Sequence, residues 1–200
     1  MIHIKRIVNR IFESNTFVIS CDGSKDIWLV DVGDTEKVID ILPNDCQVKG
    51  VFLTHTHFDH LYGINKLYDK FPDMMVYVAE SGVEALYSAK KNLSKYHELP
   101  LEYKGTKVER LSEGSFVEIY PSISLKAIAT PGHTPDSMSF LVEDQYLFTG
   151  DSYIPGVNVI SKLPGGNKMK AAESKQLLID LSIDKDVFPG HGEVVVNQKN

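Results

Sequence analysis

A chain of 200 residues is long enough to form one compact domain over residues 1–200, and a chain of this length buries about 70% of its unfolded surface. Its 42% hydrophobic and 24% charged residues exclude a disordered or collagen-like protein, and the formal charge of −6 argues against broad contact with nucleic acid. No apolar stretch approaches the length of a membrane span.

Strand-like and helical patterns alternate along the chain. The N-terminus, Met1–Arg6, is strand-like and has no signal-peptide features, so the cytoplasm is the expected compartment. Apolar residues predict strands at Thr16–Ser20, Ile27–Asp31, Val48–Leu53, Met75–Ala79, Ser124–Thr130 and Ser137–Glu143. They predict helices at Thr35–Leu42, Leu61–Phe71, Glu80–Leu93 and Lys168–Leu181. This order predicts an α/β (α+β) protein with two sheets and helices on their outer faces.

The two cysteines carry no sign of a disulfide framework. Cys21 and Cys46 lack C-x-x-C spacing, and the surrounding sequence is not that of a small disulfide-stapled domain. We expect both to be free thiols in a reducing compartment.

The densest group of metal-binding side chains follows the predicted strand that ends at Leu53. His55, His57, Asp59 and His60 lie within six residues. His55 and His57 are two apart, so an extended backbone points both to the same side. Asp59 and His60 precede the predicted helix and are expected at its N-terminus. Imidazole and carboxylate ligands suit zinc, and also iron or manganese. Solvated surface histidines are the alternative, but so compact a run favours a metal site.

Two further histidines lie in loop-like contexts. His133 stands in Thr-Pro-Gly-His-Thr and His191 in Pro-Gly-His-Gly, where core packing does not explain an imidazole. His3 and His97 stand alone in ordinary strand-like and helix-end contexts, so we expect neither to be a ligand.

The chain resembles the metallo-β-lactamase superfamily over nearly its whole length. The residues that carry the resemblance are His55, His57, Asp59, His60, His133, Asp151 and His191. Leu29–Gly33 is similar to the family's early strand and turn, and Phe148–Asp151 to the strand before its bridging aspartate. The resemblance implies a four-layer αββα sandwich with its ligands on loops along one edge. It also implies two metal sites bridged by Asp151, with the remaining ligands divided as His55, His57 and His133, and Asp59, His60 and His191.

The charges of such a site predict hydrolysis. Two zinc ions would carry four positive charges, and Asp59, Asp151 and a bridging hydroxide would cancel three of them. One net positive charge would remain to stabilise an anionic transition state. Coordination lowers the pKa of bound water from 15.7 to about 7. We therefore expect a metal-bridging hydroxide to attack a thioester or ester-like carbonyl, with Asp59 also orienting the nucleophile.

The segment after Asp151 is rich in turn formers and is expected to line the pocket mouth. Within it, Tyr153 is a candidate donor to the developing oxyanion, and Lys162 or Lys168 a candidate for binding a substrate carboxylate. A packed tyrosine and solvated lysines are the alternatives. Asp31, at a strand end, either orients a ligand histidine or caps a turn.

Departures from other branches of the superfamily favour a resemblance to glyoxalase II. Asp151 stands where true metallo-β-lactamases carry cysteine or serine, and His57 where the diiron flavoproteins use glutamate. Nine residues follow His191, so the helical extension that carries much of the glutathione site is not expected. The prediction is a hydroxyacylglutathione hydrolase-like enzyme acting on a small acyl thiol or ester, without a nucleic-acid or membrane partner.

Three alternatives stay open. Persulfide dioxygenases share much of this ligand set but hold one iron, at positions of the kind of His55, His57 or His133, and Asp151. Lactonases open cyclic esters with the same hydroxide and carry a tyrosine near the place of Tyr153. A metal-binding scaffold without turnover is the third alternative, although binding alone would not need so complete a ligand set.

Overall fold

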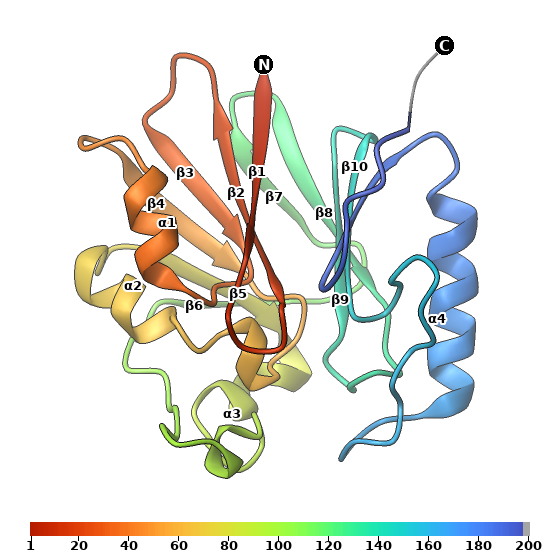
Figure 1. The fold of residues 1–200 in the computed structure, drawn as a ribbon. Coiled ribbons are helices and arrows are strands. Elements are labelled where there is room, and N and C mark those ends of the chain that lie inside the picture. Colours follow the sequence, from red (N-terminus) through yellow and green to blue (C-terminus); the bar gives the residue numbers. More distant parts are fainter. Residues whose placement is uncertain (198–200) are drawn as a thin grey trace.

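The strands form two sheets that face each other (Figure 1). The computed structural model describes residues 1–197. The first sheet contains, in order, β1 (Ile2–Val8), β2 (Asn15–Cys21), β3 (Asp26–Val30), β4 (Gln47–Phe52), β5 (Met75–Ala79) and β6 (Val108–Leu111). The second contains β11 (Asp186–Pro189), β10 (Tyr146–Gly150), β9 (Met138–Val142), β8 (Ile123–Ala129) and β7 (Phe116–Tyr120). Each half of the chain therefore provides one sheet.

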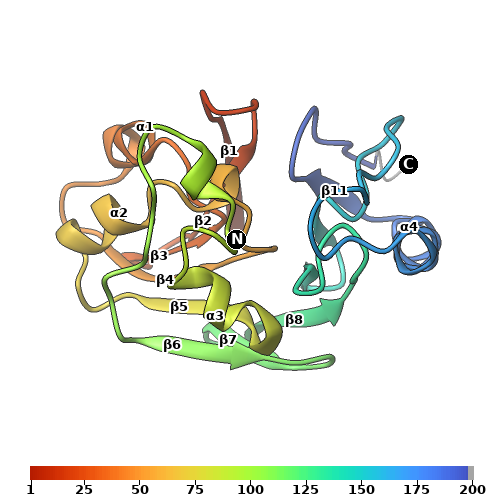
Figure 2. The same ribbon diagram turned by 90° about the horizontal axis from the view of Figure 1, so that it is seen from below.

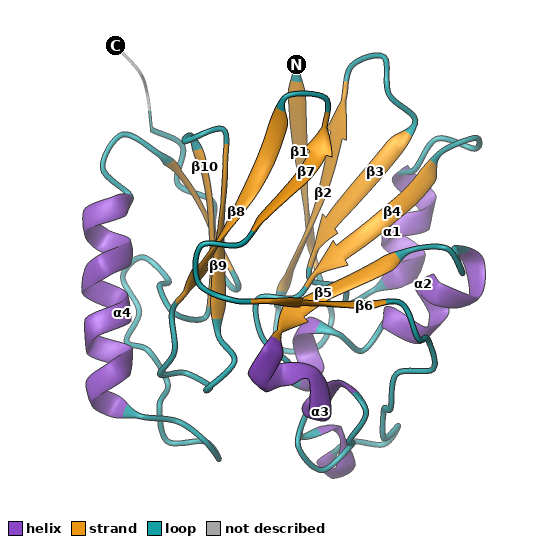
Figure 3. Ribbon diagram, turned by 180° about the vertical axis from the view of Figure 1, so that it is seen from behind, coloured by secondary structure: helices purple, strands orange, loops and turns teal. Residues whose placement is uncertain are grey.

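Strand direction differs within each sheet. Strands β1, β2 and β3 pair antiparallel, whereas β3 to β6 pair parallel. In the second sheet β7 to β10 form an antiparallel meander, and β11 joins β10 in parallel. Figure 3 shows the short connection, residues 112–115, through which the chain passes from β6 to β7.

Helices cover the outer faces of both sheets. The helices α1 (Thr35–Ile41) and α2 (Ile64–Lys70) lie beyond the first sheet, and α4 (Lys168–Leu181) lies beyond the second (Figure 2). A short helix, α3 (Val83–Leu86), follows β5. These layers confirm the predicted αββα sandwich.

Alternating apolar side chains explain why the sheets are buried on both faces. In β3, Trp28 and Val30 pack into the layer between the sheets, while Ile27 and Leu29 pack toward the helices. This is the period of two that a strand imposes on its side chains. The inter-sheet layer is rich in aromatic pairs, of which Phe17 with Phe148, Phe17 with Phe188 and Phe52 with Phe140 join the two sheets.

One predicted helix begins later than expected, and this corrects the placement of two site residues. The prediction is Leu61–Phe71, but α2 spans Ile64–Lys70. Asp59 and His60 lie before it in a single 3-10 turn, Phe58–His60, and not at the N-terminus of the α-helix.

The backbone between this turn and α2 bonds to the loop after β3 instead of continuing a helix. Val32 N–H donates to His60 O, and Gly63 N–H donates to Val32 O. A Cβ at Gly63 would lie 2.0 Å from Gly33 O, so the two loops touch through their backbones. The tertiary contact therefore overrides the helical spacing of the apolar residues.

The predicted helix Glu80–Leu93 is also wrong, because only its centre, Val83–Leu86, is α-helical. The side-chain amide of Asn92 donates to the carbonyls of Ala85 and Leu101, at 3.1 and 2.9 Å. The Asn92 side chain therefore joins the end of α3 to the segment at Leu101, and the chain folds back where the predicted helix would have continued.

Three strands, β6, β7 and β11, are missing from the sequence prediction. The first two have several exposed residues and no regular apolar alternation. The third has four residues and ends in proline. The four-residue strands β6 and β11 carry too few alternating positions to be recognised. By contrast, β5 and α4 have the bounds predicted for them. Within residues 1–197, no helix is long and apolar enough to cross a membrane.

Candidate metal centre

The H-x-H-x-D-H run lies just beyond β4, in the loop that leads to the 3-10 turn. Its ligand candidates are all buried, which is unusual for side chains of this polarity. The centroids of the His55 and His57 rings are 4.8 Å apart, and those of His55 and His60 are 4.3 Å apart. The run therefore gathers its imidazoles as the sequence predicts.

Asp31 fixes this run from the side of β3. Its carboxylate accepts hydrogen bonds from Thr54 N–H and Thr54 Oγ1, each at 2.7 Å, and from His60 Nδ1 at 2.8 Å. Asp31 is 2% exposed and has a φ of 57°. A left-handed aspartate held this way orients a histidine, which is one of the two roles expected for it.

The loop with His133 approaches from the second sheet. Gly132 has a φ of +138°, and a Cβ there would lie 2.2 Å from Ala171 N, at the start of α4. Only glycine allows the loop to pack this closely on α4. Farther along the same loop, buried Asp136 accepts hydrogen bonds from Thr56 N–H at 2.9 Å and Thr56 Oγ1 at 2.7 Å.

Asp151 and His191 reach the cluster from neighbouring strand ends. The strands β10 and β11 are parallel and end at Gly150 and Pro189, so the residues that follow lie at the same edge. His191 Nε2 is 3.5 Å from Asp151 Oδ2 and 3.3 Å from Asp59 Oδ2. Donors from both halves of the chain thus meet between the sheets.

The donor atoms form three overlapping groups, each within 4.8 Å, among residues 1–197. These groups are His55, His57 and His133; His55, His60 and Asp151; and Asp59, His60 and His191. All seven predicted ligands are therefore brought together.

Most of the imidazoles are oriented through their outer nitrogen. His133 Nδ1 donates to Ile160 O at 2.6 Å and His191 Nδ1 to Phe12 O at 2.9 Å, as His60 Nδ1 does to Asp31. In each case Nε2 is left facing the cluster. Phe12 has a φ of 52°, so its backbone is strained at the point where it accepts from His191.

The spacing of the inward atoms around His60 fits a tetrahedral metal ion. His60 Nε2 lies 3.3 Å from both Asp59 Oδ2 and His191 Nε2, and 3.4 Å from Asp151 Oδ1. Ligands at about 2.0–2.1 Å from one zinc ion in a tetrahedral arrangement are about 3.3 Å apart. His55 Nε2 and Asp151 Oδ1 are buried without a hydrogen-bond partner within residues 1–197. Buried polar atoms need a partner, and a cation supplies one.

The electrostatics of the cluster also suit a cation. Burial lowers the pKa of His55 well below its ordinary value and, with His133 nearby, lowers that of His57 to about 4. Burial acts in the same direction on His191, but Asp151 and Asp59 raise its pKa to about 9. Neutral imidazoles are ready to bind a metal, whereas the carboxylate side of the cluster attracts positive charge.

Tyr153 is not brought to this cluster. Its ring packs against an apolar group beneath α4 formed by Ile128, Leu147 and Leu178. The oxyanion contact predicted for Tyr153 therefore has no support in this geometry. Lys162 and Lys168 line a cavity between α4 and the segment 158–162, not the cavity over the cluster.

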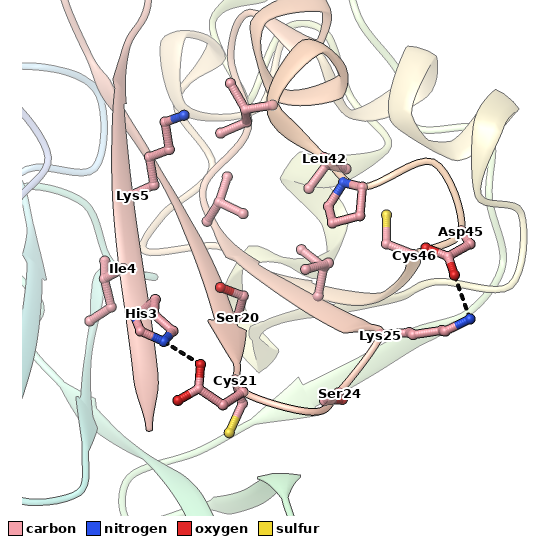
Figure 4. Close-up of a pocket in the computed structure, with 15 residues that line it drawn as sticks. His3, Ile4, Lys5, Ser20, Cys21, Ser24, Lys25, Leu42, Asp45 and Cys46 are labelled. Atoms are coloured by element: carbon pink, nitrogen blue, oxygen red, sulfur yellow. Dashed lines mark hydrogen bonds and ion pairs between the residues drawn. The ribbon is translucent and has the colours of Figure 1, made fainter.

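A separate cavity of about 440 Å³ lies at the opposite end of β2 and β3 (Figure 4). His3 is placed there and bonds Asp22 at 2.6 Å, and both free cysteines, half-buried Cys21 and buried Cys46, line it. His97 instead stacks on Phe58, with ring centroids 4.5 Å apart, beside the metal cluster. His97 thus belongs to the wall of the site, although none of the donor groups found among residues 1–197 includes it.

Sequence reasoning missed three contributors to the site. Asp136 carries a weak signal, a carboxylate three residues after His133 in a turn-rich loop. The carbonyls of Phe12 and Ile160 carry none, because a backbone acceptor is the same in every residue type.

Comparison with known proteins identifies the family of this chain. A family model described as the metallo-beta-lactamase superfamily matches residues 10–191. The chain belongs to the metallo-beta-lactamase superfamily.

Relatives within the superfamily have different activities. A hydroxyacylglutathione hydrolase from Pseudoalteromonas translucida (strain TAC 125) is 28% identical over 193 residues, 96% of this chain but 65% of that protein. The chain thus spans just under two thirds of that relative. The crystal structure of the BLEG-1 B3 metallo-beta-lactamase matches with a TM-score of 0.87 and 25% identity, covering 96% of this chain and 93% of that one. TTHA1623, solved in a di-iron-bound form, matches with a TM-score of 0.80 and 23% identity, covering 96% and 94%.

Proposed function

We propose that this protein is a metal-dependent hydrolase of a thioester or an ester-like bond, similar to glyoxalase II. The observation that carries the proposal is the convergence of the seven predicted ligands, with buried His55 Nε2 and Asp151 Oδ1 making no hydrogen bond within residues 1–197. The similarity to a hydroxyacylglutathione hydrolase supports the reaction class.

Two divalent ions would be divided as the resemblance implies. In this proposal His55, His57 and His133 would hold one ion, Asp59, His60 and His191 would hold the other, and Asp151 would contribute to both. When bound, such ions supply a water of lowered pKa and positive charge for an anionic transition state. Asp59 additionally orients the nucleophile. Zinc is the proposed metal, with iron or manganese as alternatives, since a structural relative is described with two irons.

The first experiment is elemental mass spectrometry of untagged protein purified without oxygen or chelator. We expect about two divalent ions per chain and hydrolysis of simple thioesters. His55→Ala and Asp151→Asn should lose both metal and turnover, whereas His3→Ala, far from the cluster, should lose neither. Normal metal content and turnover in both ligand variants would contradict the proposal.

The same preparation separates the other reactions. A lactone and a β-lactam test the neighbouring hydrolytic activities, and oxygen uptake with glutathione persulfide tests a mono-iron dioxygenase. One iron per chain together with oxygen uptake would replace the hydrolase by the oxidoreductase.

A further inference from the structure

Three adjoining cavities form one groove with the metal cluster at its centre. The central cavity, about 240 Å³, is lined by five of the proposed ligands together with Phe12, Leu93 and Ile160. A cavity of about 410 Å³ shares Phe12, Asp151, Ile160 and His191 with it. A cavity of about 360 Å³ shares His57 and Leu93 with it. A substrate bound over the cluster can therefore extend in two directions.

The first direction, which we call the apolar arm, has walls of Phe12, Ile154, Val157, Val159 and Ile160. Three of these are well exposed, with Phe12 at 65%, Ile160 at 59% and Val157 at 48%. Exposed large apolar side chains grouped beside a polar cluster mark a binding surface.

The exposed ring of Phe12 is held in place rather than free. Its backbone has a φ of 52°, and its carbonyl accepts from His191 Nδ1 at 2.9 Å. Its ring meets the edge of the His97 ring, with centroids 5.7 Å apart. The hydrogen bond to its carbonyl and the contact with His97 thus hold an apolar ring at the mouth of the site.

The second direction, which we call the basic arm, is lined by Lys90 and Lys91. Lys91 pairs with Glu84, whereas Lys90 makes no ion pair within residues 1–197. The Asp136 carboxylate in the same wall is engaged by Thr56. Lys90 therefore offers this arm an ammonium group with no ion-pair partner within residues 1–197, beside the proposed metal centre. One lysine matches a single negative charge, as in a carboxylate.

We propose that the substrate is an amphiphilic monoanion. Its thioester or ester carbonyl lies over the cluster, an apolar chain occupies the apolar arm, and a carboxylate lies near Lys90. This inference rests on the proposed hydrolase and adds the nature of the two substrate ends. In the reaction water adds across the C–S or C–O bond: its oxygen joins the acyl carbon, the leaving thiol or alcohol takes one proton, and the new acid ionises.

Four thioesters test both ends. Acetyl and octanoyl groups are each joined to 3-mercaptopropionate, which is anionic, and to 3-mercaptopropionamide, which is neutral. We expect octanoyl-mercaptopropionate to have the highest kcat/KM. The longer chain should contribute about tenfold or more, and the partly solvated charge about fivefold.

Matched variants assign each preference to its arm. Lys90→Ala should bring the kcat/KM ratio of the anionic to the neutral thioester toward one. The control is Lys49→Ala, which removes the charge of an exposed lysine outside the groove. Ile160→Ser should reduce the ratio of octanoyl to acetyl turnover. Ile183→Ser, also exposed but beyond α4, is its control.

A binding measurement keeps the substrate inference separate from the reaction. The thioether 3-(octylthio)propionate lacks the carbonyl, so calorimetry with the metal-loaded protein reports occupancy of the arms without turnover. We expect binding that both Lys90→Ala and Ile160→Ser weaken. Equal rates with all four thioesters would overturn the substrate inference while leaving the hydrolase. If no thioester is hydrolysed but the thioether binds in a way that depends on Lys90 and Ile160, the proposed hydrolase is overturned and the groove stands as the binding site.

Discussion

Thr54 and Thr56 flank His55, and each donates two hydrogen bonds to a buried carboxylate. Thr54 bonds Asp31 from the first half of the chain, and Thr56 bonds Asp136 from the second. The H-x-H run is therefore held on both sides of its first histidine. Partners of this kind orient metal ligands and influence metal affinity.

We predict that Asp136→Ala lowers metal content and reduces kcat by about 10–100-fold, the range typical for loss of such a partner. Asp136→Asn should retain most of both, because the amide carbonyl can still accept from Thr56. Elemental analysis, kcat and thermal unfolding are measured on the same preparations. A lower melting temperature with unchanged metal content and kcat would mean that Asp136 only stabilises the loop.

Tyr153→Phe should leave turnover and stability unchanged. The hydroxyl makes no hydrogen bond within residues 1–197, and the ring packs against the apolar group beneath α4. Steady-state kinetics of the two proteins on one thioester are sufficient. A fall in kcat without a change in KM would restore the oxyanion role expected from the sequence.

At this scale the sequence predicted the ligand types well and their surroundings poorly. His55 to His60 lie close together in the chain, so their chemistry is visible in one short run. Asp136 and the carbonyls of Phe12 and Ile160 act only because the loops fold against one another, and that contact has no local signal.

The start of α1 is tied to the β1–β2 loop through Asp34. This aspartate is 3% exposed and accepts from Lys37 at 2.8 Å, from Tyr62 Oη at 2.5 Å and from Arg10 N–H at 3.0 Å. Burial alone would raise its pKa, but these hydrogen bonds lower it to about 2. Asp34 thus holds the loop that carries Phe12.

Asp34 should contribute to stability in a pH-dependent way. Its folded pKa lies below the unfolded value of about 3.9, so the contribution is present above that value and is lost as pH falls toward 2. We expect Asp34→Asn to lower the free energy of unfolding by about 1–2 kcal/mol at pH 7, since partly exposed partners are screened. Urea titrations at pH 7, 5, 4 and 3 should show the difference between the two proteins shrinking below pH 4. A constant difference would contradict the linkage.

Elements with strong internal signals were predicted with the correct bounds, as α4 and β5 show. The two misplaced helices share a cause in contacts outside the helix. The Gly63 N–H donates to Val32 O in another loop, and the Asn92 side-chain amide donates to Leu101 O, where the chain has turned back. Periodicity reports which side chains are apolar, and it does not report which backbone groups find partners elsewhere.

For the whole molecule, metal removal should lower stability as well as activity. A ligand that binds only the folded state stabilises it by mass action, and here the proposed ions also satisfy His55 Nε2 and Asp151 Oδ1. We expect exhaustive chelation to lower the melting temperature and re-addition of zinc to restore it. The His55→Ala variant should show a smaller response to chelator. A melting temperature insensitive to chelation would show that the cluster folds independently of metal.

The connection 112–115 between β6 and β7 divides the proposed ligands. His55, His57, Asp59 and His60 precede it, and His133, Asp151 and His191 follow it. Neither sheet alone can complete either metal site, because Asp151 is shared and each site takes a histidine from each half. Metal binding would therefore report when the two sheets dock during folding. In a refolding experiment, protection of the ions from a chelating dye should begin only after docking, however early each sheet forms.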